Sequence, residues 1–202
     1  MNKLRILLLF ISLSFACFSY AIESPKEILN KVASNFTKGQ AVSIDFLLHE
    51  GEKNAKGNII IKGEKYFLSV EGIKIWFDGK TMWTYVLNNE EVNITSPTEE
   101  EIKKSSPFLF LYMYNEGYDL KMGVSKGDYN EIIMTRTLSS RAFSKIIIRI
   151  NKRTYDPMFI QIENQNTIMS ISDMTITRKK FVDSEFKFNE NLYPNIDLID
   201  LR

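Results

Sequence analysis

Few residues of this chain of 202 could carry out chemistry, because it holds one histidine and one cysteine. His49 ends an apolar run and has no second metal ligand near it in sequence. A thiol–histidine pair or a multi-histidine zinc site needs more such residues, above all if Cys17 is removed with a leader. The sequence also lacks a glycine-rich phosphate loop and a nucleophile elbow. It therefore predicts a protein that is not an enzyme and that binds no cofactor and no metal.

Carboxylate chemistry is the one catalytic alternative that the composition leaves open. Asp78 or Asp173 could work with Glu163 as an acid and base pair, as in secreted hydrolases. None of the three lies in a motif that recommends it. A turn or a solvated role is the favoured interpretation of each.

The N-terminus has the pattern of a secretory signal peptide. Lys3 and Arg5 precede a run of 13 apolar residues, Ile6–Phe18, and small residues follow at Ser19 and Ala21. Thirteen residues at about 1.5 Å each cannot cross about 30 Å of hydrocarbon. We expect cleavage after Ala21, so that residues 1–21 are the signal peptide and residues 22–202 form one exported domain.

Lipidation at Cys17 is the alternative fate of this leader, because a lipidation site also follows such an apolar run. The bulky Phe15 stands two residues before the cysteine, where small residues fit the peptidase. Cleavage at Ala21 is therefore the favoured interpretation. The mature chain then has no thiol, and its stability must come from its core rather than from disulfides.

The charge of the mature chain argues against nucleic-acid binding. Two of the 26 basic residues lie in the leader, so 24 basic residues face 25 acidic ones. Nucleic-acid-binding proteins usually carry a basic surplus that neutralises phosphates. The basic run Arg178-Lys179-Lys180 is more typical of a solvated turn than of a docking site.

One helix is written plainly at the start of the mature chain. Ser24-Pro25-Lys26-Glu27 combines an N-cap hydroxyl, a proline at the first helical position and a carboxylate at the third. One apolar face follows, and Gly39 ends the helix. The residues of this face are Ile28, Leu29, Val32, Ala33 and Phe36.

From residue 42 onward, apolar residues alternate with polar ones and turn residues separate the runs, which is typical of antiparallel strands. The predicted strands cover residues 42–48, 58–61, 66–70, 73–77, 81–86, 91–94, 119–122, 130–135, 144–150, 158–163, 167–171, 174–177, 185–189 and 196–201. A helical interruption is predicted between them, with one start signal at Ser96–Glu99. A second short helix, from Phe108 to about Tyr114, is apolar on every face. The fold class is therefore mainly β with a few helices, a curved sheet with helices on its concave face.

The helix from Phe108 to Tyr114 admits two interpretations. A helix that is apolar all round is normally buried in a core. It could instead be a lid with one face on the sheet and the other on an apolar ligand. The sheet would enclose packed side chains in the first case and room for a ligand in the second.

The ordered motifs resemble those of periplasmic outer-membrane lipoprotein carriers of the LolA type, in a divergent branch. Asp78–Tyr85 is similar to the family's Asp-Gly-Lys-Thr-Leu-Trp-x-Tyr hairpin, and Gly57 opens a strand as it does there. Ser106-Pro107-Phe108 resembles the start of the family's lid helix. Phe186-Lys187-Phe188 and Tyr193-Pro194 resemble its ending.

The resemblance implies an unclosed antiparallel β-barrel of about 11 strands, with a helical lid over a concave apolar face. It implies a periplasmic chaperone that shields acyl chains and shuttles lipoproteins from the inner to the outer membrane. The implied partners are triacylated lipoproteins, an inner-membrane lipoprotein-releasing transporter and an outer-membrane receptor, and the carrier is expected to be a monomer. A periplasmic sensor or interaction module that uses the same half-barrel is the alternative function.

One departure from the family concerns the arginine that contacts the lid from inside the cavity. The matching position here is Gly63. The neighbouring Lys62 should point to the opposite face of the sheet, because side chains alternate along a strand. This arginine contact with the lid, here called the latch, is therefore expected to be missing or relocated.

Alternation and the resemblance together suggest which side chains line the acyl-binding cavity, although the same residues could simply pack together. The predicted lining is Ile44, Phe46, Ile59, Ile61, Trp83, Tyr85, Phe186 and Phe188 of the sheet and its C-terminal extension, with Phe108, Leu111 and Tyr112 of the covering helix.

Overall fold

A computed structural model describes residues 23–37, 40–99, 101–102, 108, 114–115, 117–137, 143–164 and 167–202. The predicted leader with Cys17, and Leu111 and Tyr112 of the predicted lid, lie outside the described residues. Within the described residues, no helix is both long and apolar enough to span a membrane.

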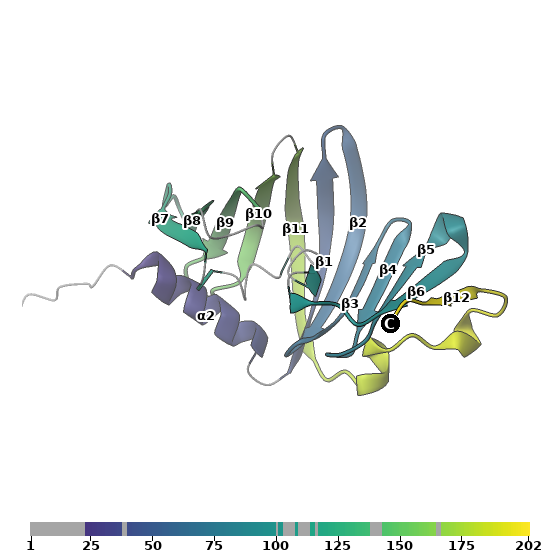
Figure 1. The fold of residues 1–202 in the computed structure, drawn as a ribbon. Coiled ribbons are helices and arrows are strands. Elements are labelled where there is room, and N and C mark those ends of the chain that lie inside the picture. Colours follow the sequence, from purple (N-terminus) through teal and green to yellow (C-terminus); the bar gives the residue numbers. More distant parts are fainter. Residues whose placement is uncertain are drawn as a thin grey trace, which may run out of the picture.

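Twelve strands form one sheet that does not close (Figure 1). Their order is β12-β6-β5-β4-β3-β2-β1-β11-β10-β9-β8-β7, so β12 and β7 are the two edges. This confirms the predicted unclosed, mainly β architecture. The strands are β1 (Ala41–Glu50), β2 (Lys53–Lys62), β3 (Lys65–Val70), β4 (Ile73–Phe77), β5 (Met82–Val86), β6 (Glu91–Thr95), β7 (Tyr118–Met122), β8 (Tyr129–Arg136), β9 (Lys145–Asn151), β10 (Pro157–Asn164), β11 (Thr167–Lys179) and β12 (Asp197–Asp200).

Helix α2 (Pro25–Thr37) begins where the sequence predicts. The Ser24 backbone N–H donates to Glu27 Oε2 over 2.8 Å, and the Glu27 N–H donates back to Ser24 Oγ over 3.3 Å. This reciprocal pair is a capping box. The bond from the Ser24 backbone, followed by that from its hydroxyl, lowers the pKa of the Glu27 carboxyl.

The apolar side of α2 is buried against one face of the sheet, here named the inner face and marked by Ile44, Ile59 and Ile148. Ile28, Leu29, Val32 and Phe36 of the helix are at most 1% exposed. The opposite, outer face carries separate clusters around Ile60 and around Trp76. The C-terminal segment, residues 181–202, covers much of this outer face. The sheet is thus covered on both faces, by different parts of the chain.

Several local predictions need correction. The first hairpin is longer than predicted, since β1 and β2 pair as far as Glu50 and Lys53. β11 is one strand rather than two, and Asp173 with φ of 50° bends it at a bulge. The second capping box joins Thr98 to Glu101 rather than Ser96 to Glu99, because the Thr98 N–H donates to Glu101 Oε2 over 2.8 Å.

The predicted strand at 185–189 is wrong. A 3-10 helix, η2 (Asp183–Phe186), stands there, and a second one, η3 (Glu190–Leu192), follows. Phe186 is fully buried in the outer-face cluster of Ala41 and Ile60, so the chain crosses the strands instead of pairing with one. β12 then pairs with β6 in parallel, against the antiparallel expectation, because the segment approaches from across the sheet.

Asp183 ties the C-terminal segment to the outer face. Its carboxylate accepts hydrogen bonds from Lys62 Nζ over 2.6 Å and Lys65 Nζ over 2.7 Å, which lower the pKa of Asp183 from 3.8 to about 2. Because the folded pKa lies below the unfolded one, this stabilisation is present above pH 3.8 and is lost as the pH falls towards 2.

We therefore expect Asp183→Asn to destabilise the protein at neutral pH and to match the wild type in acid. Urea denaturation of both proteins across this pH range measures the difference in unfolding free energy. This difference should become smaller below pH 3.8, where the wild-type carboxyl begins to gain its proton. A difference in unfolding free energy that stays constant down to pH 2 would show that the two lysine contacts do not hold the segment.

Candidate functional site

The inner face gathers five of the predicted lining residues into one apolar cluster. Ile44, Phe46, Ile59, Ile61 and Phe108 belong to it, and none is more than 4% exposed. The rings of Phe46 and Phe108 lie 5.7 Å apart at 60°, which is a favourable tilted contact. Phe108 therefore reaches the sheet, as expected for a residue of a covering element.

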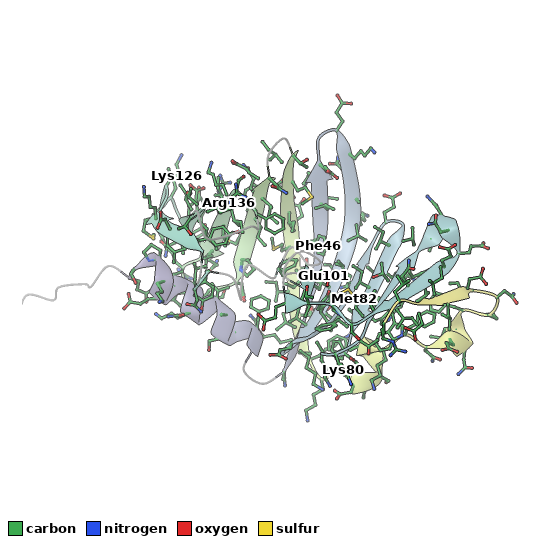
Figure 2. All side chains as sticks on the ribbon, viewed as in Figure 1. Phe46, Lys80, Met82, Glu101, Lys126 and Arg136 are labelled. Atoms are coloured by element: carbon green, nitrogen blue, oxygen red, sulfur yellow. The ribbon has the colours of Figure 1, made fainter. Side chains whose placement is uncertain are left out.

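The apolar surface extends in both directions from this cluster, across almost the whole inner face. Ile132, Ile146, Ile148 and Ile150 on β8 and β9 are fully buried in it. On the other side, Tyr66, Phe77 and Met82 pair across β3, β4 and β5. Figure 2 shows Phe46 and Met82 over the middle of the sheet.

Four of the predicted lining residues lie on the outer face instead. Tyr85 and Trp83 belong with Trp76 and Phe188 to one outer cluster, and Phe186 belongs to another. The ring of Phe188 lies 5.3 Å from that of Trp76. The expectation that all these side chains share one face with Ile44 is therefore wrong. Leu111 and Tyr112 lie outside the described residues.

The strand register explains the misplacement. Trp83 pairs with Trp76 on the outer face, while its neighbour Met82 pairs with Phe77 on the inner face. β5 is apolar on both faces, so alternation within the strand does not show which set of side chains points inward. Met82 and Tyr66 are inner-face residues that the sequence reasoning missed. The pairing of Tyr66 with Phe77 across β3 and β4 was the signal that could have found them.

Gly57 allows a close contact in the middle of the inner face. It pairs with Phe46, and a Cβ atom at Gly57 would lie only 2.4 Å from Cζ of the Phe46 ring. The ring thus lies directly over the glycine backbone. This contact gives a physical reason for a glycine at this position, which lies within β2 rather than at its start.

We expect Gly57→Ala to displace the Phe46 ring and to destabilise the protein by about 1–3 kcal/mol, the usual cost of overpacking. In a Phe46→Leu background the same substitution should cost much less, because the ring is gone. Urea denaturation of the four proteins gives the coupling energy of this cycle. Additive effects would show that the ring does not lie over Gly57.

Gly63 stands at the latch position, and the neighbouring Lys62 has the orientation that the sequence predicts. Lys62 points to the outer face, where its Nζ also donates to the Phe181 carbonyl oxygen over 3.3 Å. Gly63 follows in the β2–β3 turn with φ of 59°. Lys62 therefore holds the C-terminal segment and does not contact the cover of the inner face.

Polar contacts along α2 join it to the β9–β10 turn. Asn35 Nδ2 donates to the Thr154 carbonyl oxygen over 2.7 Å, and Lys31 Nζ donates to the Tyr155 hydroxyl over 3.0 Å. Lys31 also pairs with Glu23, whose hydrogen bond is the main cause of a raised pKa of Lys31. These contacts are exposed, and exposed ion pairs contribute little to stability. The helix is therefore held mainly by its apolar face.

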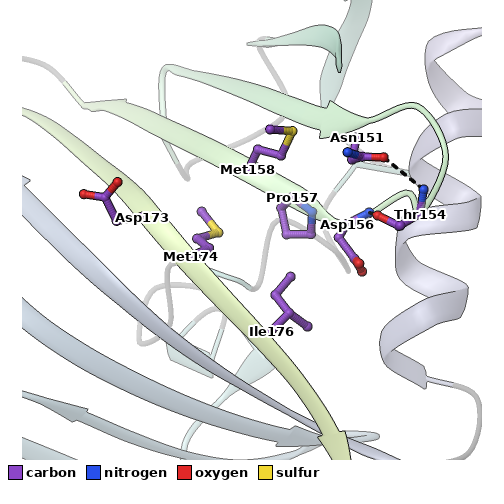
Figure 3. A pocket seen from close by; sticks show the side chains of 8 residues that line it. All are labelled: Asn151, Thr154, Asp156, Pro157, Met158, Asp173, Met174 and Ile176. Atoms are coloured by element: carbon purple, nitrogen blue, oxygen red, sulfur yellow. Dashed lines mark hydrogen bonds between the residues drawn. The ribbon is translucent and has the colours of Figure 1, made fainter. Parts of the chain in front are cut away.

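An open pocket of about 450 Å³ lies where β10 and β11 separate, beside the turn that α2 contacts (Figure 3). Its lining is mixed, and the Asp156 carboxylate there pairs with Arg178. The pocket is lined by Asn151, Thr154, Asp156, Pro157, Met158, Asp173, Met174 and Ile176.

The groups considered for catalysis have other partners. His49 Nε2 lies 2.9 Å from Ser172 Oγ, and its Nδ1 lies 2.6 Å from Asn54 Oδ1. Asp78 accepts the Thr81 N–H of its own turn over 2.9 Å, and Glu163 pairs with Lys145 over 3.1 Å. Within the described part of the chain, no three His, Cys, Asp or Glu residues are grouped as metal ligands.

Fold and site together define the class of protein: an open, mainly antiparallel sheet with a helix packed on its apolar inner face. The chain belongs to the family of the outer membrane lipoprotein carrier protein LolA, whose model matches residues 15–166. This confirms the resemblance noted in the sequence. Among curated proteins, none matches the chain.

The solved structures that this chain resembles have very different sequences. An uncharacterized conserved protein from Thermus thermophilus has a TM-score of 0.59 at 10% identity, over 87% of this chain and 98% of that one. The LolA superfamily protein NE2245 from Nitrosomonas europaea has a TM-score of 0.42 at 10% identity, over 83% and 99%. A putative outer membrane lipoprotein-sorting protein domain from Vibrio parahaemolyticus has a TM-score of 0.40 at 10% identity, over 84% and 97%.

Proposed function

We propose that this protein is a periplasmic carrier that binds the acyl chains of lipoproteins on its inner face and shuttles them from the inner to the outer membrane. The observation that carries the proposal is the continuous apolar surface from Met82 to Ile148, which is covered by α2 and contacted by Phe108. Membership of the LolA family supports it.

The energetics of the inner face suit such a carrier. Each methylene group removed from water contributes about 0.8 kcal/mol, so an acyl chain left bare in the periplasm would cost on the order of 10 kcal/mol. Transfer from a bilayer to an apolar protein surface gains little of that free energy. An apolar surface without strong polar anchors therefore binds moderately and can release its cargo to a receptor.

The side chains of the inner face pack against one another and against their cover. Ile44 and Ile59 have no exposed surface, and Phe46 and Phe108 are almost fully buried. Acyl chains therefore reach the surface only when the cover separates from the sheet. Loading then exposes apolar surface, which explains why such a carrier would need a transporter that supplies energy.

The remaining parts of the proposal rest on the predicted leader and on membership of the family. The signal peptide, residues 1–21, would be removed on export, and residues 22–202 would act as one domain and as a monomer. The cargo would be triacylated lipoproteins. The partners would be a lipoprotein-releasing transporter in the inner membrane and a receptor at the outer membrane.

Uptake of an acyl fluorophore by purified residues 22–202, in competition with palmitate, tests the proposal. Two neighbouring buried isoleucines of β2 provide a matched pair, because Ile61 lies on the inner face and Ile60 on the outer face. We expect Ile61→Asn to weaken uptake and Ile60→Asn to retain it, with circular dichroism showing that both fold. Absence of uptake by well-folded wild-type protein, or equal loss in both variants, would contradict the proposal.

A further inference from the structure

The sheet opens between β10 and β11. These strands pair only from Ile160 with Ile171 to Asn164 with Thr167. Beyond that point, β11 pairs with β1 at Ser172 and at residues 175–179, with a bulge at Asp173 and Met174 between them, and it pairs with no strand of the described chain on its other side. Figure 3 shows the two strands diverging beside α2. The regular part of this edge, residues 175–179, therefore has no strand partner on that side among the described residues, although it lies in the middle of the sheet.

A free edge of this kind presents alternate backbone N–H and C=O groups to the gap. Another extended backbone satisfies such a row fully, which is the basis of recognition by strand addition. Most folded proteins protect their edge strands by bulges, charges or short length. Here a bulge at Asp173 and the ion pair between Arg178 and Asp156 interrupt the two ends of the edge.

The pocket in the gap borders the inner-face cluster. Met174 and Ile176 line it and also pack against the inner-face cluster, whereas Met158 on the other side is 40% exposed. Its two acidic lining residues, Asp156 and Asp173, are accompanied by no basic lining residue, and Arg178 neutralises only the first. The gap between β10 and β11 thus combines an apolar inner end, the edge of β11 and the carboxylate of Asp173, whose charge no lining residue balances.

We propose, on the basis of the carrier function above, that the polypeptide of the cargo leaves the inner face through this gap and pairs with the free edge of β11. A lipoprotein joins its acyl chains to a polar backbone, which cannot be buried on an apolar surface without hydrogen-bond partners. The gap lets the acyl chains stay inside while the adjoining segment becomes an added strand. The charge of Asp173 favours a segment with a lysine or arginine.

The two outer edges of the sheet, β12 and β7, fit less well. β12 borders the outer-face cluster, away from Ile44 and Phe46. β7 is separated from β11 by three strands, β10, β9 and β8, and none of its residues lines the pocket. Exit at β7 is therefore the competing outcome that an experiment must separate.

Disulfide trapping tests the exit path in the mature chain, which has no other cysteine if the leader is removed. The probe is a palmitoylated peptide of about eight residues, a typical strand length, with one lysine and a cysteine next to the acylated end. Thr177→Cys places a thiol on the free edge. Thr167→Cys, on the paired part of β11, and Lys121→Cys, on β7, are matched exposed controls.

We expect Thr177→Cys to form the mixed disulfide about tenfold faster than either control, because binding raises the local thiol concentration. The unacylated peptide should lose this advantage, and so should a peptide with alternate amides methylated, which cannot pair as a strand. Suppose that the probe displaces the acyl fluorophore but is trapped equally at all three sites, or preferentially at Lys121→Cys. That result would overturn the exit path and leave the carrier function standing. Retained preference of the methylated peptide would overturn strand pairing. A probe that never displaces the fluorophore would overturn the carrier function and the exit path together.

Discussion

Replacing Phe36 with alanine lowers the free energy of unfolding by about 3–5 kcal/mol, the usual cost of deleting a buried phenylalanine ring. Phe36 is 1% exposed at the C-terminal end of α2, packed in the inner-face cluster. Its loss weakens the attachment of the cover, so we also expect faster uptake of an acyl fluorophore. Stability and uptake therefore change in opposite directions.

Urea denaturation and stopped-flow fluorescence measure the two effects of Phe36→Ala. Lys26→Ala is the control, since Lys26 is exposed on the same helix and should change neither quantity much. A destabilised Phe36→Ala protein with an unchanged uptake rate would show that α2 does not cover the site of uptake.

Linking α2 covalently to the β9–β10 turn should abolish uptake. Asn35 Nδ2 and the Thr154 carbonyl oxygen lie only 2.7 Å apart, so helix and turn are close neighbours there. In the double variant Asn35→Cys/Thr154→Cys, oxidation closes a disulfide that prevents the helix from leaving the sheet. We expect fluorophore uptake to fall to background on oxidation and to return on reduction.

The single variant Asn35→Cys controls for loss of the hydrogen bond and for the oxidant itself. It should take up fluorophore equally under both conditions. Uptake by the oxidised double variant at the rate of the reduced one would mean that acyl chains reach their site without displacement of α2.

The start of α2 and most strands could be predicted because their signals are local. The capping box of Ser24 and Glu27 and the alternation in β1 depend on neighbouring residues alone. The open sheet followed from the number of strands and from the family resemblance. Cross-strand pairing, by contrast, depends on contacts between distant residues, and these decide which face of a strand points inward.

The misplaced residues illustrate this limit. Trp83 and Tyr85 alternate correctly along β5, but the strand is apolar on both faces, and only its register with Trp76 assigns them to the outer face. Phe186 and Phe188 alternate like strand residues, yet the burial of Phe186 beside Ile60 directs the chain across the strands. Two faces need covers in this protein, and the sequence reasoning assumed one.

The position of Trp76 and Trp83 makes a direct measurement of the acyl-binding site practical, because both native tryptophans lie on the outer face. Phe46→Trp adds a tryptophan to the inner face, and a brominated fatty acid quenches only the indole rings that it contacts. The proposed carrier function predicts that the fatty acid leaves wild-type fluorescence unchanged and quenches the emission added by Phe46→Trp. Quenching of the wild-type protein, or binding without quenching in the variant, would contradict an acyl-binding site on the inner face.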